Sequence, residues 1–297
     1  MVRTVQRTLV CAGWDDYELL DTGGGAKLER FGDYVLARPD TQAIWQPRLV
    51  PDFWRAAHAT FRRDAGEGGA WQCMPDMPRS WPMRWNGLSF RSELTSFRHT
   101  GVFPEQAEHW TWIDDTIRRA GRPVRMLDLF GYTGLASLVA ARAGATVTYV
   151  DASRPAMAWA RRNQELSGLT DRPIRWLLDD AGKFVAREKR RASEYDALVM
   201  DPPVFGRGPK GEIWRFGEHF PRLFAGAADL LSADPVLVLV NAYATEISPI
   251  SLANVVADSL ERRGGTLEFG ELVLAPRRPG RHLPTGIYAR WSPEPRQ

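Results

Sequence analysis

The segment 124–134 constrains the fold of this chain more than any other stretch. Residues 124–129 are mostly apolar and include one acid, Asp128, which is typical of a buried strand, and Gly131 and Gly134 indicate a tight turn after it. Residues 135–143, rich in Leu, Ala and Val, predict a helix. A strand, a glycine turn and a helix N-terminus in this order let a backbone without Cβ atoms approach a ligand closely, with free N–H groups directed at it.

A second predicted strand, residues 146–150, ends in Asp151, twenty positions after Gly131. An acid at this place and interval suits the two hydroxyl groups of a ribose, so we expect an adenosine-bearing cofactor. A NAD site would have three glycines as G-x-G-x-x-G, but this turn contains only Gly131 and Gly134. The alternative is a generic α/β turn with no cofactor.

The chain after Asp151 alternates strands and helices. Strands are expected at 174–178, 195–200 and 236–240, followed by an antiparallel pair at 266–274 and 286–291, and helices at 156–166, 181–189, 217–231 and 250–262. This alternation requires a parallel sheet covered on both faces. We therefore predict an α/β domain over residues 96–297, with a Rossmann-like, doubly wound, mostly parallel, seven-stranded sheet.

Residues 1–95 predict a smaller β-rich domain. Strands flank the glycine-rich turn at 22–25, and a stronger hairpin signal surrounds Asn86 and Gly87, because type I′ turns favour positive φ at both central residues. Eight of the twelve tryptophans precede residue 113, and arginines are interleaved with them. These side chains either form a stacking, cationic face for RNA bases or fill a small core.

The composition sets broad limits on function. Apolar residues make up 44% and charged residues 25% of the 297, as in an ordinary globular protein. The net charge of +3 permits a nucleic-acid partner without requiring one. Cys11 and Cys73 lie far apart and show no metal-ligand spacing, so we expect no metal and a reducing, cytoplasmic location. The sequence contains no apolar run of membrane-spanning length and no signal-peptide pattern at its start, so no membrane association is expected.

Further acids follow the third and fourth strands, at the sheet edge where open α/β sheets bind ligands. Asp179 and Asp180 follow the third strand, and Asp180 is either a cofactor ligand or a helix N-cap. Asp201 begins the segment D-P-P-V-F. Two prolines end the strand and stiffen the turn, which leaves a rigid acceptor for the exocyclic amine or ring N–H of a base. The alternative is a structural turn.

The segment 206–215 is basic and aromatic, and we predict a mobile loop suited to a phosphate backbone. A solvated surface loop without a ligand is the alternative. The candidate substrate-binding residues in this region are Arg207, Lys210 and Arg215.

Three motifs resemble those of a known enzyme class. D-L-F-G-x-T-G resembles the first motif of class I S-adenosylmethionine (SAM) methyltransferases, and D-P-P-x-F resembles their fourth. The segment T-G-x-F-x-x-Q at 100–106 resembles that of the bacterial 23S rRNA methyltransferases related to the cytosine-C5 and guanine-N7 enzymes, closest to the shorter members. The likeness covers about residues 96–292.

The resemblance implies SAM as cofactor, S-adenosylhomocysteine as product, and RNA, with ribosomal RNA (rRNA) favoured, as partner. It implies a glycine turn under the amino-acid end of SAM, an acid at the ribose and another at the adenine. The implied cofactor-binding residues are Phe103, Gln106, Asp128, Phe130, Gly131, Tyr132, Thr133, Gly134, Asp151, Ala152, Asp179, Asp180, Ala181 and Asp201. The implied catalytic residues are Asp201, Pro202, Pro203 and Phe205.

One departure from the family pattern bears on mechanism. Cytosine-C5 methyltransferases use a cysteine thiolate, usually after the fifth strand, and residues 241–246 contain no cysteine here. We therefore expect direct transfer to a nitrogen or oxygen, which requires alignment and at most a base. A small-molecule or protein methyltransferase, and an inactive SAM- or RNA-binding module, remain alternatives. The target atom and the oligomeric state stay open.

Overall fold

The computed structural model describes residues 1–63, 68–96, 98–207, 213–243, 246–277 and 280–294. The chain forms two compact units, each built from separate segments. The first comprises Met1–Leu9, His109–Leu272 and Gly286–Gln297, and the second comprises Val10–Glu108 and Val273–Thr285. This division differs from the predicted boundary between residues 95 and 96, because the first nine residues belong with the larger unit.

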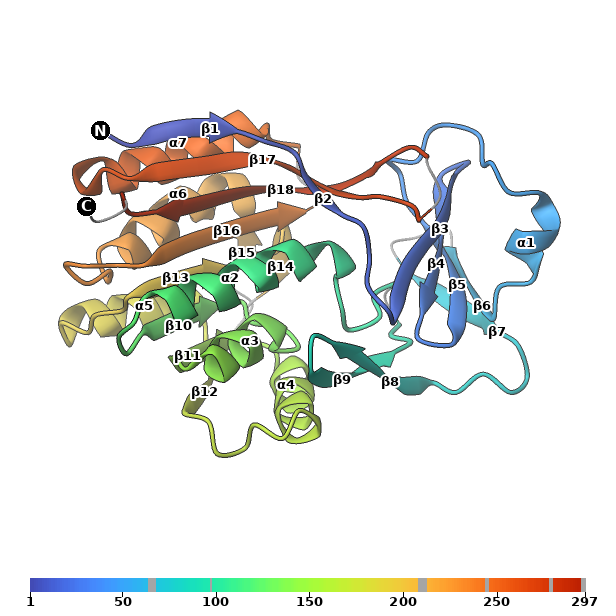
Figure 1. The fold of residues 1–297 in the computed structure, drawn as a ribbon, viewed down its shortest axis with the longest axis horizontal. Helices are drawn as coiled ribbons and strands as arrows, with labels where there is room; N and C mark the ends of the chain where they lie inside the picture. The colour runs from blue at the N-terminus through green and yellow to red at the C-terminus, as the bar shows by residue number, and fades with distance from the viewer. Residues whose placement is uncertain (64–67, 97, 208–212, 244–245, 278–279, 295–297) are drawn as a thin grey trace. The chain divides into compact units, whose positions relative to one another are not determined.

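The first unit is organised around a mostly parallel sheet in which nine strands of the described chain take part (Figure 1). Five strands are parallel neighbours, and the next strand pairs antiparallel to the fifth. The order is β12 (Ile174–Leu178), β11 (Thr146–Asp151), β10 (Arg125–Leu129), β13 (Ala197–Met200), β16 (Leu237–Tyr243), β18 (Leu283–Ser292), β17 (Thr266–Leu274) and β1 (Arg3–Gln6), with β2 (Leu9–Cys11) also paired to β17. The seven predicted strands are confirmed, and β1 and β2 extend them.

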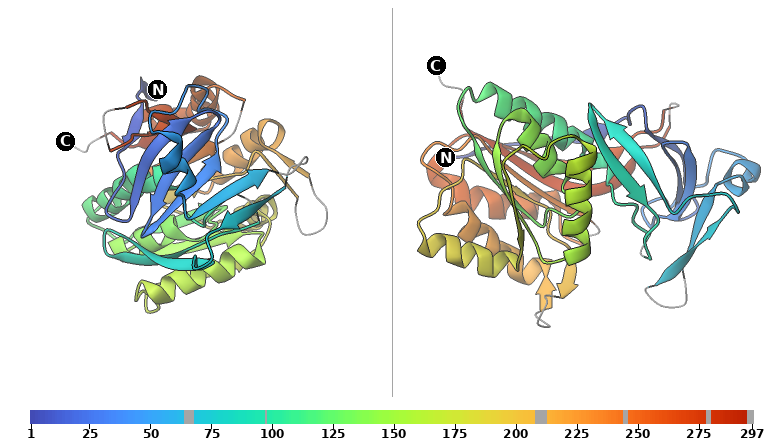
Figure 2. Two further views of the ribbon diagram at one scale, coloured as in Figure 1. Left: turned by 90° about the vertical axis from the view of Figure 1, so that its right-hand side faces the viewer. Right: turned by 90° about the horizontal axis from the view of Figure 1, so that it is seen from below.

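Helices cover both faces of this sheet, as predicted (Figures 1 and 2). One face carries α2 (Ala107–Arg119), α3 (Leu135–Ala143) and α4 (Arg154–Leu166), and the other carries α5 (Ala181–Arg190), α6 (Phe216–Ala228) and α7 (Pro249–Leu260), which η2 (Glu261–Arg263) follows. Phe184, Phe220 and Phe224 are fully buried between the sheet and α5–α7. Removal of these apolar faces from water holds the layers together.

Between Pro203 and α6, the described residues of the segment predicted as a loop include two short strands. The strands β14 (Phe205–Arg207) and β15 (Ile213–Arg215) form an antiparallel pair, and α6 begins directly after β15. The intervening residues 208–212 lie outside the described chain. The two described ends of the predicted loop therefore pair with each other as antiparallel strands, called here the β14–β15 hairpin.

The second unit contains a five-stranded sheet and a separate hairpin, which confirms a β-rich region. The elements are β3 (Tyr17–Gly23), β4 (Ala26–Phe31), β5 (Tyr34–Pro39), β6 (Ala59–Arg63), β7 (Gly69–Cys73), β8 (Ser80–Trp85), β9 (Leu88–Glu93), α1 (Pro51–Arg55) and η1 (Pro104–Gln106). Between β8 and β9, Asn86 has φ 42° and Gly87 has φ 80°, as the predicted turn requires.

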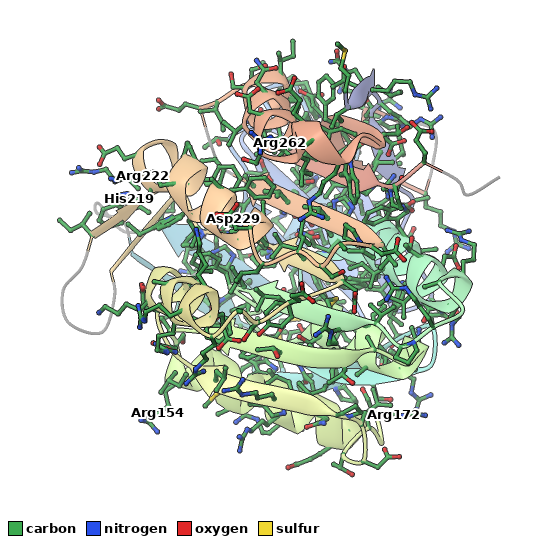
Figure 3. The ribbon with its side chains drawn as sticks, turned by 90° about the vertical axis from the view of Figure 1, so that its left-hand side faces the viewer. Arg154, Arg172, His219, Arg222, Asp229 and Arg262 are labelled. Atoms are coloured by element: carbon green, nitrogen blue, oxygen red, sulfur yellow. The ribbon has the colours of Figure 1, made fainter. Side chains whose placement is uncertain are left out.

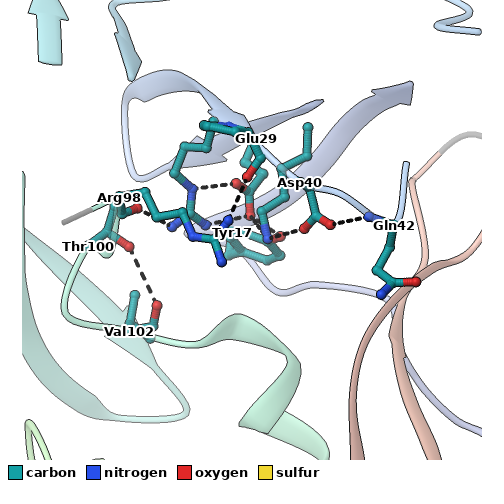
Figure 4. Close-up of polar contacts among 10 residues, drawn as sticks. Tyr17, Glu29, Asp40, Gln42, Arg98, Thr100 and Val102 are labelled. Carbon is teal, nitrogen blue, oxygen red and sulfur yellow. Dashed lines mark hydrogen bonds and ion pairs between the residues drawn. The ribbon is translucent and has the colours of Figure 1, made fainter. Parts of the chain in front are cut away.

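A buried ion pair lies in the second unit (Figure 4). Arg38 donates from Nε and Nη2 to the two carboxylate oxygens of Glu29, at 2.8 and 2.9 Å, and the Tyr17 hydroxyl donates to Oε1 at 2.9 Å. Burial opposes ionisation of Glu29, but Arg38 and Lys27 outweigh it and hold the pKa of this carboxyl below its usual value. Arg38 also donates to the carbonyl of Arg98 at 3.0 Å. The pair thus joins β4 and β5 to the chain that precedes η1.

The eight tryptophans before residue 113 favour the core-filling interpretation over a stacking face. None of them is exposed, and Trp81, Trp85 and Trp110 are buried. Indole N–H groups also bind the protein itself: Trp71 donates to the carbonyl of Thr95 at 2.8 Å, and Trp54 donates to Asp21 at 3.2 Å. The buried rings of Trp81, Trp85 and Trp110 are therefore not available for stacking on bases.

Candidate functional site

Polar side chains collect at the carboxyl edge of the parallel strands in the first unit. Asp151 ends β11, Asp179 follows β12, and Asp201 follows β13. Because the register pairs Met200 with Val240, Asp201 lies next to Asn241 of β16 at the same edge. The fold therefore brings together the acids that the sequence placed after separate strands, at the edge where open α/β sheets bind ligands.

Asp151 fixes the glycine turn to the end of β11. Its Oδ2 accepts a hydrogen bond from the backbone N–H of Tyr132 at 2.9 Å, and its Oδ1 accepts one from Ser153 at 2.7 Å. Burial raises the pKa of this carboxyl, and the two N–H donors act against the shift. A carboxylate has about four lone-pair sites, so Asp151 can accept further bonds from the hydroxyls of a ribose.

The turn after β10 is held in a backbone conformation that side-chain-bearing residues rarely adopt. Phe130 has φ 63° and Tyr132 has φ 47°. The Tyr149 hydroxyl donates to the Tyr132 carbonyl at 2.6 Å, and Asn163 donates to the Thr133 carbonyl at 3.0 Å. Strained conformations persist where their surroundings enforce them, and they concentrate at ligand sites.

The two glycines of this turn are required by packing within the protein. A Cβ on Gly131 would lie 2.3 Å from the Tyr149 ring, and one on Gly134 would lie 2.8 Å from the Cβ of Ala160. Gly134 also has φ 81°. The prediction from sequence explained these glycines by close approach of a ligand, whereas the structure supplies the Tyr149 ring and the contact between α3 and α4 as reasons.

Asp128 lies in β10 and is almost fully buried. The Ser137 hydroxyl donates to its Oδ2 at 2.6 Å. Burial raises the pKa of Asp128 to about 7, with smaller contributions from the charges of Asp151 and Asp201. The motif acid thus changes protonation state near neutral pH.

The residues after β12 have structural partners of their own. Asp179 pairs with Arg187 and accepts from the backbone N–H of Asp180 at 2.9 Å. Asp180 caps α5 by accepting from the N–H of Lys183 at 2.8 Å, so the N-cap alternative is observed. Ala181 is buried, and Ala152 after β11 is exposed. Cofactor contacts from these residues stay a prediction.

The segment D-P-P-V-F joins three elements. Asp201 accepts from the amide Nδ2 of Asn241 at 3.0 Å, and Pro202 is buried. The Pro203 carbonyl accepts from the indole N–H of Trp214 at 2.5 Å. Phe205 begins β14 with 54% of its surface exposed. This geometry fixes the Asp201 carboxylate, and the ring of Phe205, four residues later, is open to solvent.

Two residues that sequence reasoning did not place in the site contribute to it. The ring of Trp214 lies 5.4 Å from that of Phe130, so β15 contacts the strained turn as well as Pro203. Asn241 contacts Asp201 because their strands are neighbours. The position of Asn241 in the predicted fifth strand could have indicated this contact only once the strand order was known.

The remaining predicted residues are less fully defined. Phe103 and Gln106 belong to the second unit, where the Phe103 ring lies 5.3 Å from that of His99, and their role at the cofactor stays a prediction. Arg215 is exposed and pairs with Glu218 at 3.3 Å. Lys210 and the side chain of Arg207 lie outside the described chain.

Among the described residues, no group of three or more His, Cys, Asp or Glu side chains could hold a metal ion. None of the helices in the described ranges is both long and apolar enough to cross a membrane.

Comparisons with known proteins agree with this geometry. A crystal structure of a SAM-dependent methyltransferase from Agrobacterium tumefaciens is 41% identical, with a TM-score of 0.94 over 99% of this chain and 96% of that one. The ribosomal RNA large subunit methyltransferase K of Neisseria meningitidis is 31% identical over 52% of this chain and 44% of its own length. The methyltransferase K/L of Magnetococcus marinus is 33% identical over 51% of this chain and 20% of its own. The chain thus matches less than half the length of these two curated relatives.

A family model described as S-adenosylmethionine-dependent methyltransferase matches residues 57–260, which include the strained turn, Asp151 and the D-P-P-V-F segment. The donor set at the sheet edge suits this cofactor, because the Asp151 carboxylate can accept ribose hydroxyls and the turn presents backbone groups beside it. The chain therefore belongs to the S-adenosylmethionine-dependent methyltransferase family, with SAM as its cofactor.

Proposed function

We propose that this enzyme methylates a nitrogen or oxygen atom of a base in large-subunit rRNA, in the cytoplasm, without a cysteine adduct. Two relatives of this chain are ribosomal RNA large subunit methyltransferases by name, which supports the choice of rRNA. The observation that carries the chemistry is the Asp201 carboxylate, held by Asn241 at 3.0 Å and followed by two prolines at the cofactor edge of the sheet.

The chain's own residues divide into a cofactor side and an acceptor side. In this proposal Asp151 would hold the ribose of SAM, Asp179 and Asp180 would bind on the adenine side, and the turn 130–134 would hold the amino-acid end. SAM supplies an electrophilic methyl group. Asp201 binds the exocyclic amine or ring N–H of the acceptor, aligns it, and accepts its proton where the reaction releases one.

The outer face of the β14–β15 hairpin is suited to RNA. The register pairs Phe205 with Arg215, and side chains alternate between faces along each strand, so Phe205, Ile213 and Arg215 share one face while Trp214 occupies the other. All three side chains on the first face are exposed. An aromatic ring, an aliphatic side chain and a guanidinium group can contact an unstacked base and a phosphate.

Two nitrogen-bearing side chains lie on the first turns of α6, and the ring of one of them, His219, lies 5.6 Å from that of Trp214. His219 and Arg222 project from the same stretch of the helix, three residues apart (Figure 3). Arg222 is exposed, and His219 is partly exposed. Contacts of this kind position a nucleic acid without reading its sequence.

The state of the cysteines supports direct transfer. Burial raises the pKa of Cys11 to about 12, and its thiol donates to the Pro104 carbonyl at 3.3 Å, so it is not a thiolate at neutral pH. Cys73 is exposed, and both cysteines belong to the second unit. Cys11 therefore lacks the surroundings of an activated nucleophile.

The test is methyl transfer from labelled SAM to deproteinised large-subunit rRNA, followed by mass spectrometry of the digested nucleosides. Small-subunit rRNA, a protein mixture and a small-molecule extract serve as alternative acceptors. We expect a methylated nitrogen or oxygen in large-subunit rRNA alone. Label in the protein or small-molecule fraction, or on a C5 carbon, would contradict the proposal.

Asp201→Ala should lower the turnover number by roughly 100-fold or more, because the acceptor loses its positioning group, with SAM affinity in calorimetry nearly unchanged. The double change of Cys11 and Cys73 to serine is the control and should retain turnover. A folded but inactive double variant would indicate a covalent route instead.

A further inference from the structure

Beneath Asp201 lies a group of buried polar atoms that the function described so far does not use. Within the described chain, Oδ1 of Asn241 and both ring nitrogens of His109 have no hydrogen-bond partner. His109 is fully buried, and Asn241 is 4% exposed. An unmade hydrogen bond of a buried group costs about 1–3 kcal/mol, so such atoms require an explanation.

The fold places these two side chains next to each other for a clear reason. Asn241 of β16 is opposite Tyr288 of β18 in the antiparallel register, and the Tyr288 ring lies 5.3 Å from the His109 ring at the start of α2. Burial lowers the pKa of His109 well below its usual value, and Arg290 adds to the shift. The Asn241 side chain acts on the ring in the opposite direction. His109 is therefore a neutral imidazole beside the Asn241 amide.

A neutral imidazole carries one N–H donor, and Oδ1 of Asn241 is an acceptor. The amide can face Asp201 with only one of its two ends. Nδ2 donates to the Asp201 carboxylate at 3.0 Å, whereas the flipped amide would set Oδ1 against an anionic oxygen. Anything that fixes the Oδ1 end of the amide therefore also fixes the end that holds Asp201.

We propose that the ring N–H of His109 donates to Oδ1 of Asn241, and that His109 and Asn241 are positioning residues that orient Asp201 towards the methyl acceptor. The Asn241 side chain raises the pKa of His109 as a hydrogen-bond acceptor does, which agrees with this bond. The chain of contacts then runs from α2 through β16 to the carboxylate after β13. This inference rests on the role proposed for Asp201.

Three variants separate positioning from packing. His109→Phe keeps a ring against Tyr288 and removes the donor, whereas His109→Gln keeps a donor. Asn241→Leu keeps much of the amide's volume and removes both of its hydrogen-bonding ends. We expect His109→Phe and Asn241→Leu to lower kcat by about 10-fold or more, because a misplaced catalytic group loses alignment. The KM for SAM should stay within about 2-fold of wild type, and His109→Gln should keep most of the wild-type kcat.

A second measurement does not depend on activity. The side-chain amide of Asn241, assigned in the ¹⁵N NMR spectrum by its absence in Asn241→Leu, should exchange slowly with solvent in the wild type. Exchange should be faster in His109→Phe and Asp201→Ala and close to wild type in His109→Gln. Equal exchange in His109→Phe and the wild type would overturn the proposal.

The two measurements distinguish the possible failures. If the wild type methylates no RNA, the proposed function fails. The exchange rates of the Asn241 amide in the two His109 variants still test this inference. If RNA is methylated and His109→Phe retains the wild-type kcat, the proposed function stands and the positioning role is wrong. Loss of kcat in both His109 variants would indicate packing alone and would also overturn it.

Discussion

Asp128 shows how one residue links the cofactor motif to stability. Its pKa in the folded protein is about 7, against about 3.9 for a free aspartate, because burial disfavours the ionised carboxylate more than the hydrogen bond from Ser137 favours it. The folded state therefore holds this proton more tightly than the unfolded chain does. The associated stability is fully present at low pH and is lost as pH rises through about 7, by at most about 4 kcal/mol.

Asp128→Asn should remove this pH dependence, since an amide does not ionise and can still accept a hydrogen bond from Ser137. Denaturant unfolding of the SAM-free protein between pH 5 and 8 measures the effect. The wild type should lose stability relative to the variant as the pH increases. Ser137→Ala is the control and should move the loss to higher pH, because the hydroxyl stabilises the ionised form. Parallel curves for wild type and Asp128→Asn would contradict the assigned pKa.

At the scale of elements, the contact between α3 and α4 depends on Gly134. An alanine there would combine a positive φ with a Cβ only 2.8 Å from that of Ala160. We expect Gly134→Ala to lower the free energy of unfolding by about 2–4 kcal/mol, through backbone strain and overpacking. Adding Ala160→Gly to the Gly134→Ala variant should recover the part of this loss that comes from the contact between the two Cβ atoms.

Gly144, at the other end of α3, provides the matched control. It has φ 108°, and a Cβ there would meet nothing within 4 Å. Gly144→Ala should therefore cost only the backbone strain, and Ala160→Gly should not relieve it. Equal losses at the two glycines would mean that the helices move apart without cost.

The β14–β15 hairpin depends on Trp214. Trp214→Phe keeps a ring near Phe130 and removes the N–H that donates to the Pro203 carbonyl. We expect kcat to fall by about 10-fold with little change in SAM affinity, because the turn after Asp201 loses its anchor. Trp71→Phe, which removes a similar bond to Thr95 in the second unit, should leave kcat unchanged. A wild-type kcat in Trp214→Phe would show that the β14–β15 hairpin does not help to align Asp201 with the methyl acceptor.

The spacing of apolar residues and the positions of glycine and proline predicted the regular elements of the larger unit well. Residues 135–143 were predicted as a helix and form α3, and residues 156–166 were predicted as a helix and lie within α4. The hairpin was missed because β14 and β15 are three residues each, too short to show alternation. The acids could be predicted because each follows a strand. The strained φ values of Phe130 and Tyr132 and the contact of Asn241 with Asp201 could not, because they depend on tertiary neighbours.

For the whole molecule, the decisive feature is the pairing of β1 with β17. Every residue of β1 is exposed, so no apolar pattern marks it as part of the sheet. Its partner strand begins 263 residues later, at Thr266. This long separation explains why a division by composition assigned residues 1–95 to a single domain.

A chain that begins near residue 96 should therefore be unstable, because it lacks β1 and β2 and exposes the edge of β17. Open edges pair with other chains, so we expect aggregation in size-exclusion chromatography and a lower melting temperature than the full chain shows. Adding a peptide of residues 1–11 should partly reverse both effects. A monomeric fragment of unchanged stability would show that β1 contributes little. If this fragment fails to bind RNA, that result would not place an RNA-binding region in residues 1–95, because the fragment itself is expected to be unstable.

The same pairing bears on the order of events during synthesis. Ribosomes add about 5–20 residues per second, so residues 3–6 emerge roughly 10–50 s before their partners in β17. The five parallel strands lie between residues 125 and 243 and can assemble in that interval. They are β10, β11, β12, β13 and β16. The first strand made must wait unpaired until residue 266 of 297 has been added. Three of its four side chains are charged or polar, which lowers the tendency of the unpaired segment to aggregate.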